Sequence, residues 1–419
     1  MTGMQRDVLP DIYEALLQPN GAAFAREPDP PEADIQELNP EFPVHAFRGV
    51  FADYREAMVG TTEASDVAHF ASLWVSLAAT LGRTVSMYAG DVLYPNVYLA
   101  FFGSTGDKKT TAMRRPSALR LIPDHVTLVQ NVGSTEGLAD KLKREDDNDT
   151  VALFYWEEFA ALLARGRWSG STVLEFLTEA FDCPSTWGLE YRRNKVEIHR
   201  PTPSILTGTT PEWFWKHAKS EDFYGGFGNR FVFLKGDRKP PIPNPIQPNL
   251  TKVQCVRDAF ERIAQIGHTS AEFDAAAASV WGKYYLQSEL QRPEGLLGAA
   301  TKRIHVVVRK LCMVYAAVEG TLPFITEDQL RASISVGRYA FLSMKSLLEV
   351  QAVGRSRDGE LEQRFLEWLR KHNGRARKRD MQQTLSKACG DCETFNRVVR
   401  NLEQAGYIEI RDREVLLRG

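Results

Sequence analysis

The segment 96–111 is the part of the sequence that most constrains the fold. Its apolar run, residues 97–102, predicts a buried strand. A turn that contains Gly103 and Gly106 follows, and Lys109 opens a segment that we expect to be helical. A strand, a glycine turn and a helix in this order direct backbone N–H groups and the positive end of the helix dipole toward one point. The segment therefore predicts a phosphate-binding loop.

The same segment fits the P-loop pattern G-x-x-x-x-G-K-[ST] except at one position, where Lys108 replaces the second glycine. In this pattern Lys109 reaches the β- and γ-phosphates, and the hydroxyl of Thr110 is a Mg²⁺ ligand. The cofactors that the pattern implies are ATP and Mg²⁺. The expected ATP-binding residues are Gly103, Ser104, Thr105, Gly106, Asp107, Lys108, Lys109, Thr110 and Thr111. The alternative is an ordinary strand-to-helix turn that happens to contain lysines.

After this loop, further apolar runs alternate with helical patterns and predict strands at 126–130, 151–156, 204–210 and 231–234. Such alternation indicates an α/β fold with a parallel sheet, whose ligands bind at the carboxyl ends of the strands. Glu157 and Glu158 stand at one of these ends. We expect Glu157 to hold the hydrated Mg²⁺ and Glu158 to deprotonate the attacking water. The alternative is a solvated pair of acids at the start of a helix.

Two basic features lie farther along the chain. A β-hairpin is predicted for 187–199, and Arg192, Arg193 and Lys195 at its tip suit contact with the phosphate backbone of DNA. A solvated tip is the alternative. A glycine-rich loop then delivers Arg230 to the start of a strand, as an arginine finger requires. On its residues alone, a surface salt bridge explains Arg230 equally well.

Changes in composition divide the chain into five parts: an acidic, proline-rich arm (1–60), a core with a support helix (61–236), a proline-rich linker (237–250), a helical lid (251–352) and a winged helix (353–419). The last prediction rests on three helical patterns followed by a short hairpin. This part holds fifteen basic and eleven acidic residues, and its third helix offers Arg397 and Arg400 to a DNA groove. Docking to a protein is the other use of such modules.

Composition limits the classes of function. The net charge of −2 excludes a uniformly basic surface, so any contact with nucleic acid has to be local. Five cysteines without a secretory leader indicate a reducing cytoplasm, and no apolar run reaches the length of a membrane span. We therefore expect a cytoplasmic protein without membrane contact. Cys389 and Cys392 have metal-ligand spacing, but we interpret it as a coincidence because no second pair completes a zinc site.

The order of these motifs makes the chain resemble a known group. The P-loop is followed by Trp156-Glu-Glu-Phe-Ala-Ala-Leu-Leu163, the hairpin, the threonine-rich strand and Asn229-Arg-Phe231. In this it is similar to the helicase-like P-loop ATPases of phages, plasmids and integrated elements, which are relatives of the superfamily 3 and MCM-type AAA+ helicases. The likeness covers residues 62–350. Members of the group often carry a basic residue before the P-loop lysine, as Lys108 does here.

The resemblance implies an AAA+-like P-loop core with helical N-terminal and lid regions and a C-terminal winged helix. It matches the hairpin to one that lines the pore of a hexamer and tracks DNA. It matches Thr209 or Thr210 to the residue called sensor 1, and Arg230 to a finger that reaches the ATP of the neighbouring subunit. Arg303 and Arg309 are its candidates for sensor 2, with buried structural arginines as the alternative. The partners that it implies are single-stranded DNA in a central pore, further copies of the chain in a homo-hexamer, and a separate primase.

Residues and resemblance together predict an ATP-hydrolysing, ring-forming DNA translocase or helicase that acts in the replication of a mobile element. The expected catalytic residues are Glu158, Lys109 and Arg230. An ATP-gated DNA-binding regulator or loader that unwinds nothing is the first alternative. A protein-remodelling ATPase, with the winged helix used only for docking, is the second.

Overall fold

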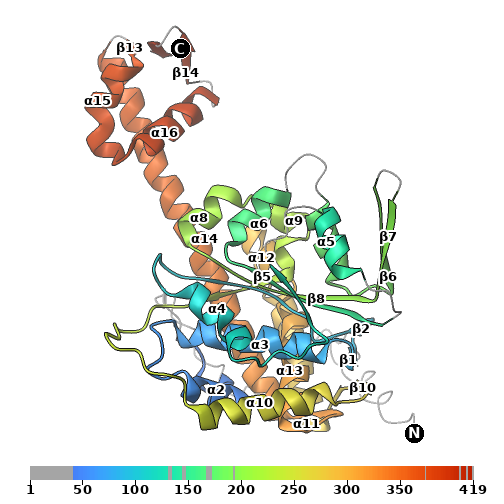
Figure 1. Ribbon diagram of the computed structural model, residues 1–419. Helices are drawn as coiled ribbons and strands as arrows, with labels where there is room; N and C mark the ends of the chain where they lie inside the picture. The colour runs from blue at the N-terminus through green and yellow to red at the C-terminus, as the bar shows by residue number, and fades with distance from the viewer. Residues whose placement is uncertain are drawn as a thin grey trace, which may run out of the picture. The chain divides into compact units, whose positions relative to one another are not determined.

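The computed structural model describes residues 41–130, 135–143, 148–166, 172–191, 194–372, 374–404, 407–411 and 414–417. Its centre is a sheet in which every neighbouring pair of strands is parallel (Figure 1). The five strands lie in the order β4 (Thr127–Gln130), β5 (Thr150–Trp156), β8 (Pro201–Thr209), β3 (Tyr98–Phe102) and β9 (Phe231–Lys235). With helices on either side, this sheet confirms the predicted α/β class.

Helices cover both faces of the sheet because its strands are apolar on both sides. Along β3, Leu99 and Phe101 pack into one core, whereas Tyr98, Ala100 and Phe102 pack into the other. The first core includes α3 (Asp66–Leu81), α4 (Lys109–Ala118), α10 (Leu250–Ala264) and α13 (Ile304–Glu319). The second includes α5 (Thr135–Leu142), α6 (Phe159–Gly166), α7 (Val173–Ala180), α8 (Pro211–His217), α9 (Ser220–Tyr224) and α12 (Gly295–Thr301).

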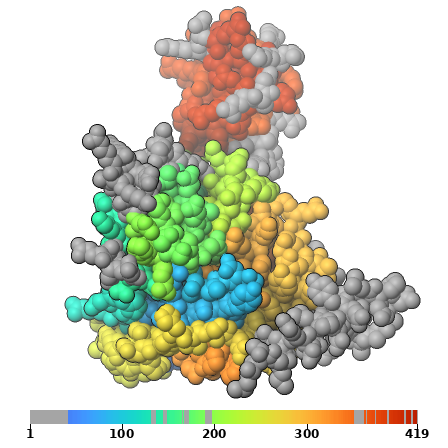
Figure 2. Space-filling view, turned by 90° about the vertical axis from the view of Figure 1, so that its right-hand side faces the viewer, coloured from blue at the N-terminus to red at the C-terminus, as the bar shows by residue number. Residues whose placement is uncertain are grey.

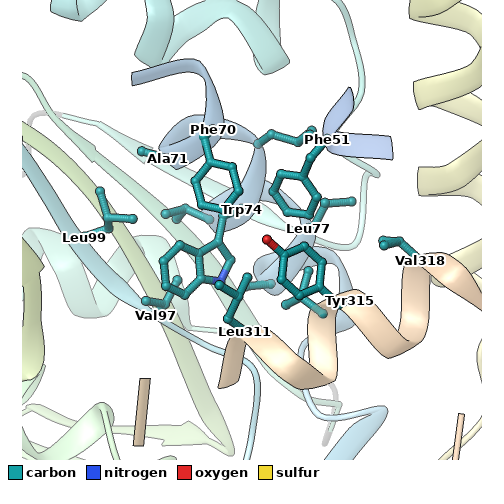
Figure 3. Packing of buried hydrophobic residues seen from close by; sticks show 14 of the residues in the cluster. Phe51, Phe70, Ala71, Trp74, Leu77, Val97, Leu99, Leu311, Tyr315 and Val318 are labelled. Carbon is teal, nitrogen blue, oxygen red and sulfur yellow. The ribbon is translucent and has the colours of Figure 1, made fainter. Parts of the chain in front are cut away.

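The core on the first face is built around α3, the support helix that the apolar periodicity predicts. Ser65 caps the helix by accepting a hydrogen bond from an N–H of its first turn at 3.0 Å, and the helix ends at Gly82, whose φ is 49°. Nearly every residue between them is buried, and Trp74 lies in the middle of the cluster (Figure 3). The rings of Phe51 and Phe70 pack beside it with centroids 4.7 Å apart.

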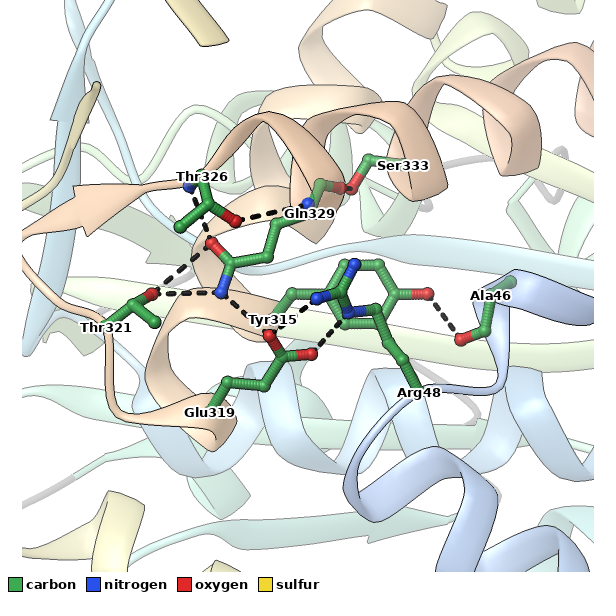
Figure 4. A network of polar contacts seen from close by, with 8 residues as sticks. All are labelled: Ala46, Arg48, Tyr315, Glu319, Thr321, Thr326, Gln329 and Ser333. Carbon is green, nitrogen blue, oxygen red and sulfur yellow. Dashed lines mark hydrogen bonds and ion pairs between the residues drawn. The ribbon is translucent and has the colours of Figure 1, made fainter. Parts of the chain in front are cut away.

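Part of the predicted N-terminal arm is folded into this core. It contains the 3-10 helix η1 (Val44–Ala46) and the helix α2 (Val50–Ala57). The Arg48 guanidinium pairs with Glu319 of α13, and the Tyr315 hydroxyl donates to the Ala46 carbonyl at 2.8 Å (Figure 4). Two turns of helix offer too few apolar positions for a helical period to be recognised in the sequence. The remainder of the predicted arm, residues 1–40, lies outside the described residues.

A helical region follows the sheet. It consists of α10, α11 (Ala275–Leu290), α12, α13 and α14 (Glu327–Lys371). α10 packs against α2 and α3, and its yellow residues lie below the blue ones in the space-filling view (Figure 2). α12 and α13 are separate helices that follow each other closely in the chain. α14 runs without a break through residue 353, where the sequence suggested a new domain, even though Gly354 and Gly359 are poor helix formers.

Short strands pair outside the main sheet. β1 (Val85–Tyr88) pairs with β2 (Val92–Leu93) and β10 (Thr269–Ser270), and β11 (Glu272–Phe273) pairs with β12 (Phe324–Ile325). The predicted hairpin is present as the antiparallel strands β6 (Thr186–Tyr191) and β7 (Asn194–His199). Within the described residues, no helix has both the length and the apolar character that a membrane span requires.

The C-terminal module, residues 361–417, has a hydrophobic core of its own. It comprises the end of α14, β13 (Arg375–Arg377), α15 (Lys378–Cys389), α16 (Cys392–Gln404), β14 (Ile408–Arg411) and β15 (Glu414–Leu417). Its strands form an antiparallel sheet in the order β13-β15-β14. Phe365, Phe395 and Val398 are completely buried. The three helices and the hairpin occur where the sequence predicts them, and β13 is an additional strand.

Candidate functional site

The predicted phosphate loop joins β3 to α4 at the carboxyl edge of the sheet. A Cβ on Gly103 would lie 2.5 Å from a backbone carbonyl of the segment after β9 and 2.6 Å from a carboxylate oxygen of Asp107, so only glycine fits there. Gly106 has a φ of 92°, which glycine adopts without strain. The loop curls around the Lys109 ammonium, which donates to the carbonyls of Gly103 at 3.0 Å and Ser104 at 2.7 Å.

Lys108, the one departure from the P-loop pattern, adopts the conformation for which glycine is best suited. Its φ of 52° and ψ of 29° lie in the left-handed region. That region costs a residue with a side chain about 1–2 kcal/mol. Lysine at this position therefore keeps the backbone shape of the loop despite the strain, and it adds a positive charge there.

The first turn of α4 points N–H groups at the same loop. Among the described residues, no side chain caps this helix. The N–H of Ala112 donates to the Lys108 carbonyl at 3.3 Å, as in a regular helix. The N–H groups of Lys109, Thr110 and Thr111 come before this first bond, and at these positions a helix has no carbonyl that could accept from them. A phosphate bound here would accept these hydrogen bonds and gain from the helix dipole.

The ends of β5 and β8 bring two more functional groups to the loop. β8 lies between β3 and β5, and its last residue, Thr209, pairs with the last residue of β3. A Cβ on Gly208 would lie 3.7 Å from both the Lys109 side chain and the Glu157 backbone. The Lys109 side chain and the end of β5 therefore both lie next to Gly208. Glu158, the next residue, shares this space.

The charges at this point influence one another. Burial raises the pKa of the Glu158 carboxyl above its usual range, although the Thr209 hydroxyl and the Lys109 ammonium oppose the rise. Burial also lowers the pKa of Lys109, against the charges of Asp107, Glu158 and Glu212. A partly buried carboxylate next to a fixed ammonium, with a raised pKa, is suited to accept a proton from water.

The Glu157 side chain is directed toward α4. Its carboxylate forms an ion pair with Arg114, and both side chains line a small pocket with Thr110, Gln130 and Tyr155. Mg²⁺ prefers oxygen ligands and takes only one or two of them from protein, the rest being water and phosphate. Thr110 and Glu157 therefore fit a Mg²⁺ ion that arrives with a nucleotide.

The two threonines that end β8 have different environments. The Thr210 hydroxyl caps α8 by accepting a hydrogen bond from the Trp213 N–H at 3.3 Å. The Thr209 side chain is completely buried, and its hydroxyl is the one that acts on the pKa of Glu158. Of the two sensor 1 candidates, Thr209 is thus the one next to the predicted catalytic carboxylate.

Two charged residues near the loop were missed by the sequence reasoning. Arg114 follows Thr110 by one helical turn, and this spacing was the available signal that the two share a helix face. Glu212 lies in the first turn of α8, close enough to act on the pKa of Lys109. Glu212 follows the threonine-rich end of a predicted strand, just as Glu157 follows the end of another predicted strand, and this position was the available signal.

Arg230 lies at the opposite, amino edge of the sheet. It is the last residue of η2 (Gly228–Arg230), directly before β9, which runs parallel to β3. Its guanidinium donates to the Gly226 carbonyl at 2.7 Å and to Asp182 at 2.9 Å, and its side chain is only 11% exposed. The length of the sheet therefore separates Arg230 from Lys109 of the same chain.

The sensor 2 candidates also lie away from the loop of their own chain. Arg303 donates to the second oxygen of Asp182 at 3.3 Å, beside Arg230, and burial lowers its pKa. Arg309 packs its guanidinium over the ring of Trp281, 4.4 Å from the centroid. The environment of Arg309 is thus that of a buried structural arginine, the alternative to a sensor 2 role. Arg303 instead shares the Asp182 carboxylate with Arg230.

The predicted DNA contacts are only partly described. Arg192 and Arg193 lie outside the described residues, as does the side chain of Lys195 in β7. Arg397 and Arg400 are exposed on α16, on the face opposite the residues that enter the core of the C-terminal module. Their position is compatible with contact to a large partner.

Comparison with known proteins adds no assignment. Neither a scan against protein-family models nor a search of curated proteins finds a match to this chain. The class that the fold defines is an α/β protein with a five-stranded, all-parallel sheet flanked by helices.

Proposed function

We propose that the protein is an ATP-hydrolysing P-loop enzyme with an AAA+-like core. One observation carries the proposal: Lys109 at the start of α4, Glu158 after β5 and Thr209 at the end of β8 meet at the carboxyl edge of the sheet. A cradle of N–H groups, one lysine and one basic carboxylate are what phosphoryl transfer to water requires. An ordinary turn that happens to contain lysines gives no reason for this convergence.

In the proposed reaction, the loop N–H groups and the Lys109 ammonium bind the β- and γ-phosphates of ATP. The Glu158 carboxylate accepts a proton from a water molecule whose oxygen attacks the γ-phosphorus. The bond from this phosphorus to the bridging oxygen breaks, which leaves ADP and inorganic phosphate. Mg²⁺, held with the help of Thr110 and Glu157, neutralises charge on the phosphates when it is bound. The Thr209 hydroxyl acts on the pKa of this carboxylate, lowering it against the effect of burial.

The position of Arg230 supports a site shared between subunits. An arginine at the amino edge of one sheet can meet the carboxyl edge of another copy if the subunits assemble head to tail, and such contacts generate a closed ring when the rotation closes. We therefore infer a homo-oligomeric ring, hexameric by resemblance, in which Arg230 completes the ATP site of the neighbour.

We infer that ATP hydrolysis drives translocation on DNA, in the replication of a mobile element and with priming left to a separate primase. Two features support DNA as the partner: a hairpin whose tip carries three basic residues in the sequence, and a C-terminal module with Arg397 and Arg400 exposed on one helix. An ATP-gated DNA-binding regulator or loader is the second candidate. It is favoured by the C-terminal module alone, which as a winged helix would choose a DNA site without any motor.

Two variants test the ATPase proposal. Lys109→Ala removes the fixed cation on the phosphates, so it is expected to weaken ATP binding and abolish hydrolysis. Glu158→Gln keeps ATP binding but lowers turnover by orders of magnitude, because an amide does not accept the proton. Lys302→Ala, at an exposed lysine of the helical region, is the matched control and is expected to keep both properties. Phosphate release and calorimetric ATP titration measure the two quantities.

Unchanged hydrolysis in folded Lys109→Ala protein would refute the P-loop assignment. If Glu157→Gln loses turnover while Glu158→Gln keeps it, the roles of the two acids are reversed. If the wild-type protein binds no ATP at all in the presence of Mg²⁺, neither the motor nor the gated regulator is correct.

A further inference from the structure

Arg114 and Glu157 form an ion pair at the position where a metal ion would enter the site. Arg114 stands on α4 one turn after Thr110, and Glu157 follows β5 directly. Together with Thr110, they line one pocket whose remaining polar wall comes from Gln130 of β4 and Tyr155 of β5. Among the described residues, the cation that contacts the Glu157 carboxylate is thus Arg114. It shares a pocket with Thr110, whose hydroxyl is the predicted metal ligand.

Both cations would draw on the same carboxylate, whose Oε1 already accepts a hydrogen bond from Arg114. A guanidinium engages a carboxylate through directed N–H donors, whereas Mg²⁺ requires near-octahedral oxygen ligands at short distance and keeps most of its waters. A hydrated Mg²⁺ ion between Thr110 and Glu157 would also place two more positive charges next to the Arg114 guanidinium. Both the shared acceptor and the repulsion between cations therefore make binding of one disfavour the other.

The ion pair is weak enough to open. The side chains of Arg114 and Glu157 are 60% and 49% exposed, and ion pairs with this access to water contribute little, because water screens the charges and the long side chains lose freedom. The pair therefore holds Glu157 in place without blocking the site permanently. Arg114 lies on the exposed side of α4, so its side chain can move into solvent when it is displaced from Glu157.

We propose that Arg114 is a positioning residue that competes with Mg²⁺ for Glu157. In the nucleotide-free protein it neutralises the carboxylate and keeps it turned toward α4, and arrival of the metal with its nucleotide releases it. The site then discriminates against a metal ion alone, since the phosphates have to supply part of the energy that displaces the arginine. This inference rests on the proposed ATPase function and adds a residue that controls how tightly the metal is held.

The test is a metal titration that does not depend on turnover. Mn²⁺, which replaces Mg²⁺ as a spectroscopic probe, is titrated by electron paramagnetic resonance into wild type, Arg114→Met and Arg114→Lys, with a fixed concentration of a non-hydrolysable ATP analogue. Arg120→Met, at an exposed arginine just after α4, is the control for loss of one charge. Arg114→Met is expected to bind Mn²⁺ about 2- to 10-fold more tightly than wild type, with Arg114→Lys between them. The control is expected to match wild type.

The Glu157→Gln background identifies the competition. If Arg114 acts through this carboxylate, Arg114→Met changes Mn²⁺ affinity much less when Glu157 is already an amide. Unchanged or weaker Mn²⁺ binding in Arg114→Met overturns the proposal. So does weaker binding of the analogue in EDTA, since it would make Arg114 a direct phosphate ligand. Failure of the wild type to bind the analogue even with Mn²⁺ is a different result, because it refutes the ATPase function itself.

Discussion

Replacement of Arg230 is the perturbation that separates a shared-site ring from a self-contained ATPase. β9 and β3 are paired from one end to the other over five residues, and at about 3.3 Å per residue the two edges of the sheet lie roughly 15 Å apart. Arg230 stands at one edge and Lys109 at the other. This is farther than an arginine side chain reaches, so Arg230 has no direct contact with ATP bound to its own chain.

A trans-acting Arg230 gives a specific result. Arg230→Ala protein is expected to bind ATP like wild type and to lose about three to five decades of turnover, as other arginine fingers do. Mixed with Lys109→Ala protein, it is expected to recover activity. In randomly assembled rings at equal concentrations, about one interface in four joins an intact P-loop to an intact arginine, since each has a probability of one half. Recovery is therefore expected to reach at most about a quarter of wild-type turnover.

The assay measures phosphate release at several mixing ratios, and co-assembly is verified by a tag on one variant. Arg200→Ala is the matched control, because Arg200 also precedes a strand at the amino edge and pairs with a carboxylate, that of Asp149 at 2.9 Å. It is expected to keep wild-type turnover. Two inactive variants that co-assemble and remain inactive at every ratio would refute the shared site. The ATP-gated regulator would then be the better hypothesis.

Two further predictions concern other parts of the chain. Burial lowers the pKa of Lys310 to about 8, whereas an unfolded chain keeps it near 10.5. Between pH 8 and 10.5 Lys310 is protonated in the unfolded state but largely neutral in the folded state. The free energy of unfolding of wild type, relative to that of Lys310→Met, is therefore expected to rise by up to about 3 kcal/mol over this pH range. Denaturant unfolding at several pH values measures this difference, and a difference that does not change with pH would contradict the prediction. Replacing Arg192, Arg193 and Lys195 by alanine is expected to weaken single-stranded DNA binding and make its salt slope shallower by about 2. An unchanged slope would assign these residues to a solvated tip.

The parallel sheet was predictable because buried parallel strands are continuous apolar runs. Residues 97–102 and 151–156 read as strands on this ground, and the turn with Gly103 reads as a phosphate loop because few other folds need glycine and lysine in that order. The carboxyl-edge position of Glu157 and Glu158 then follows from topology alone. Local pattern was sufficient wherever one strand and its following turn determine the geometry.

Long-range polar contacts were not predictable, since nothing local specifies them. Arg48 and Glu319 are separated by 271 positions, and their pairing fixes a segment that composition assigns to an arm. The contact between Arg114 and Glu157 depends on how α4 packs beside the end of β5. Asp182 has no feature in the sequence that distinguishes it from a surface acid, yet in the structure it holds two arginines.

Asp182 connects these observations to assembly. It binds both Arg230 and Arg303 in the isolated chain, and the side chain of Arg230 is largely buried. A phosphate from a neighbouring subunit would have to take Arg230 from this carboxylate, which it can do because it offers more negative charge and more acceptor oxygens than one carboxylate does. In the proposed ring, Arg230 would leave Asp182 for the ATP of a neighbour, and Arg303 would remain as the partner of Asp182. In such a ring, hydrolysis in one subunit would depend on the presence of the subunit that supplies Arg230, and that arginine would leave Asp182 only for a site that holds ATP.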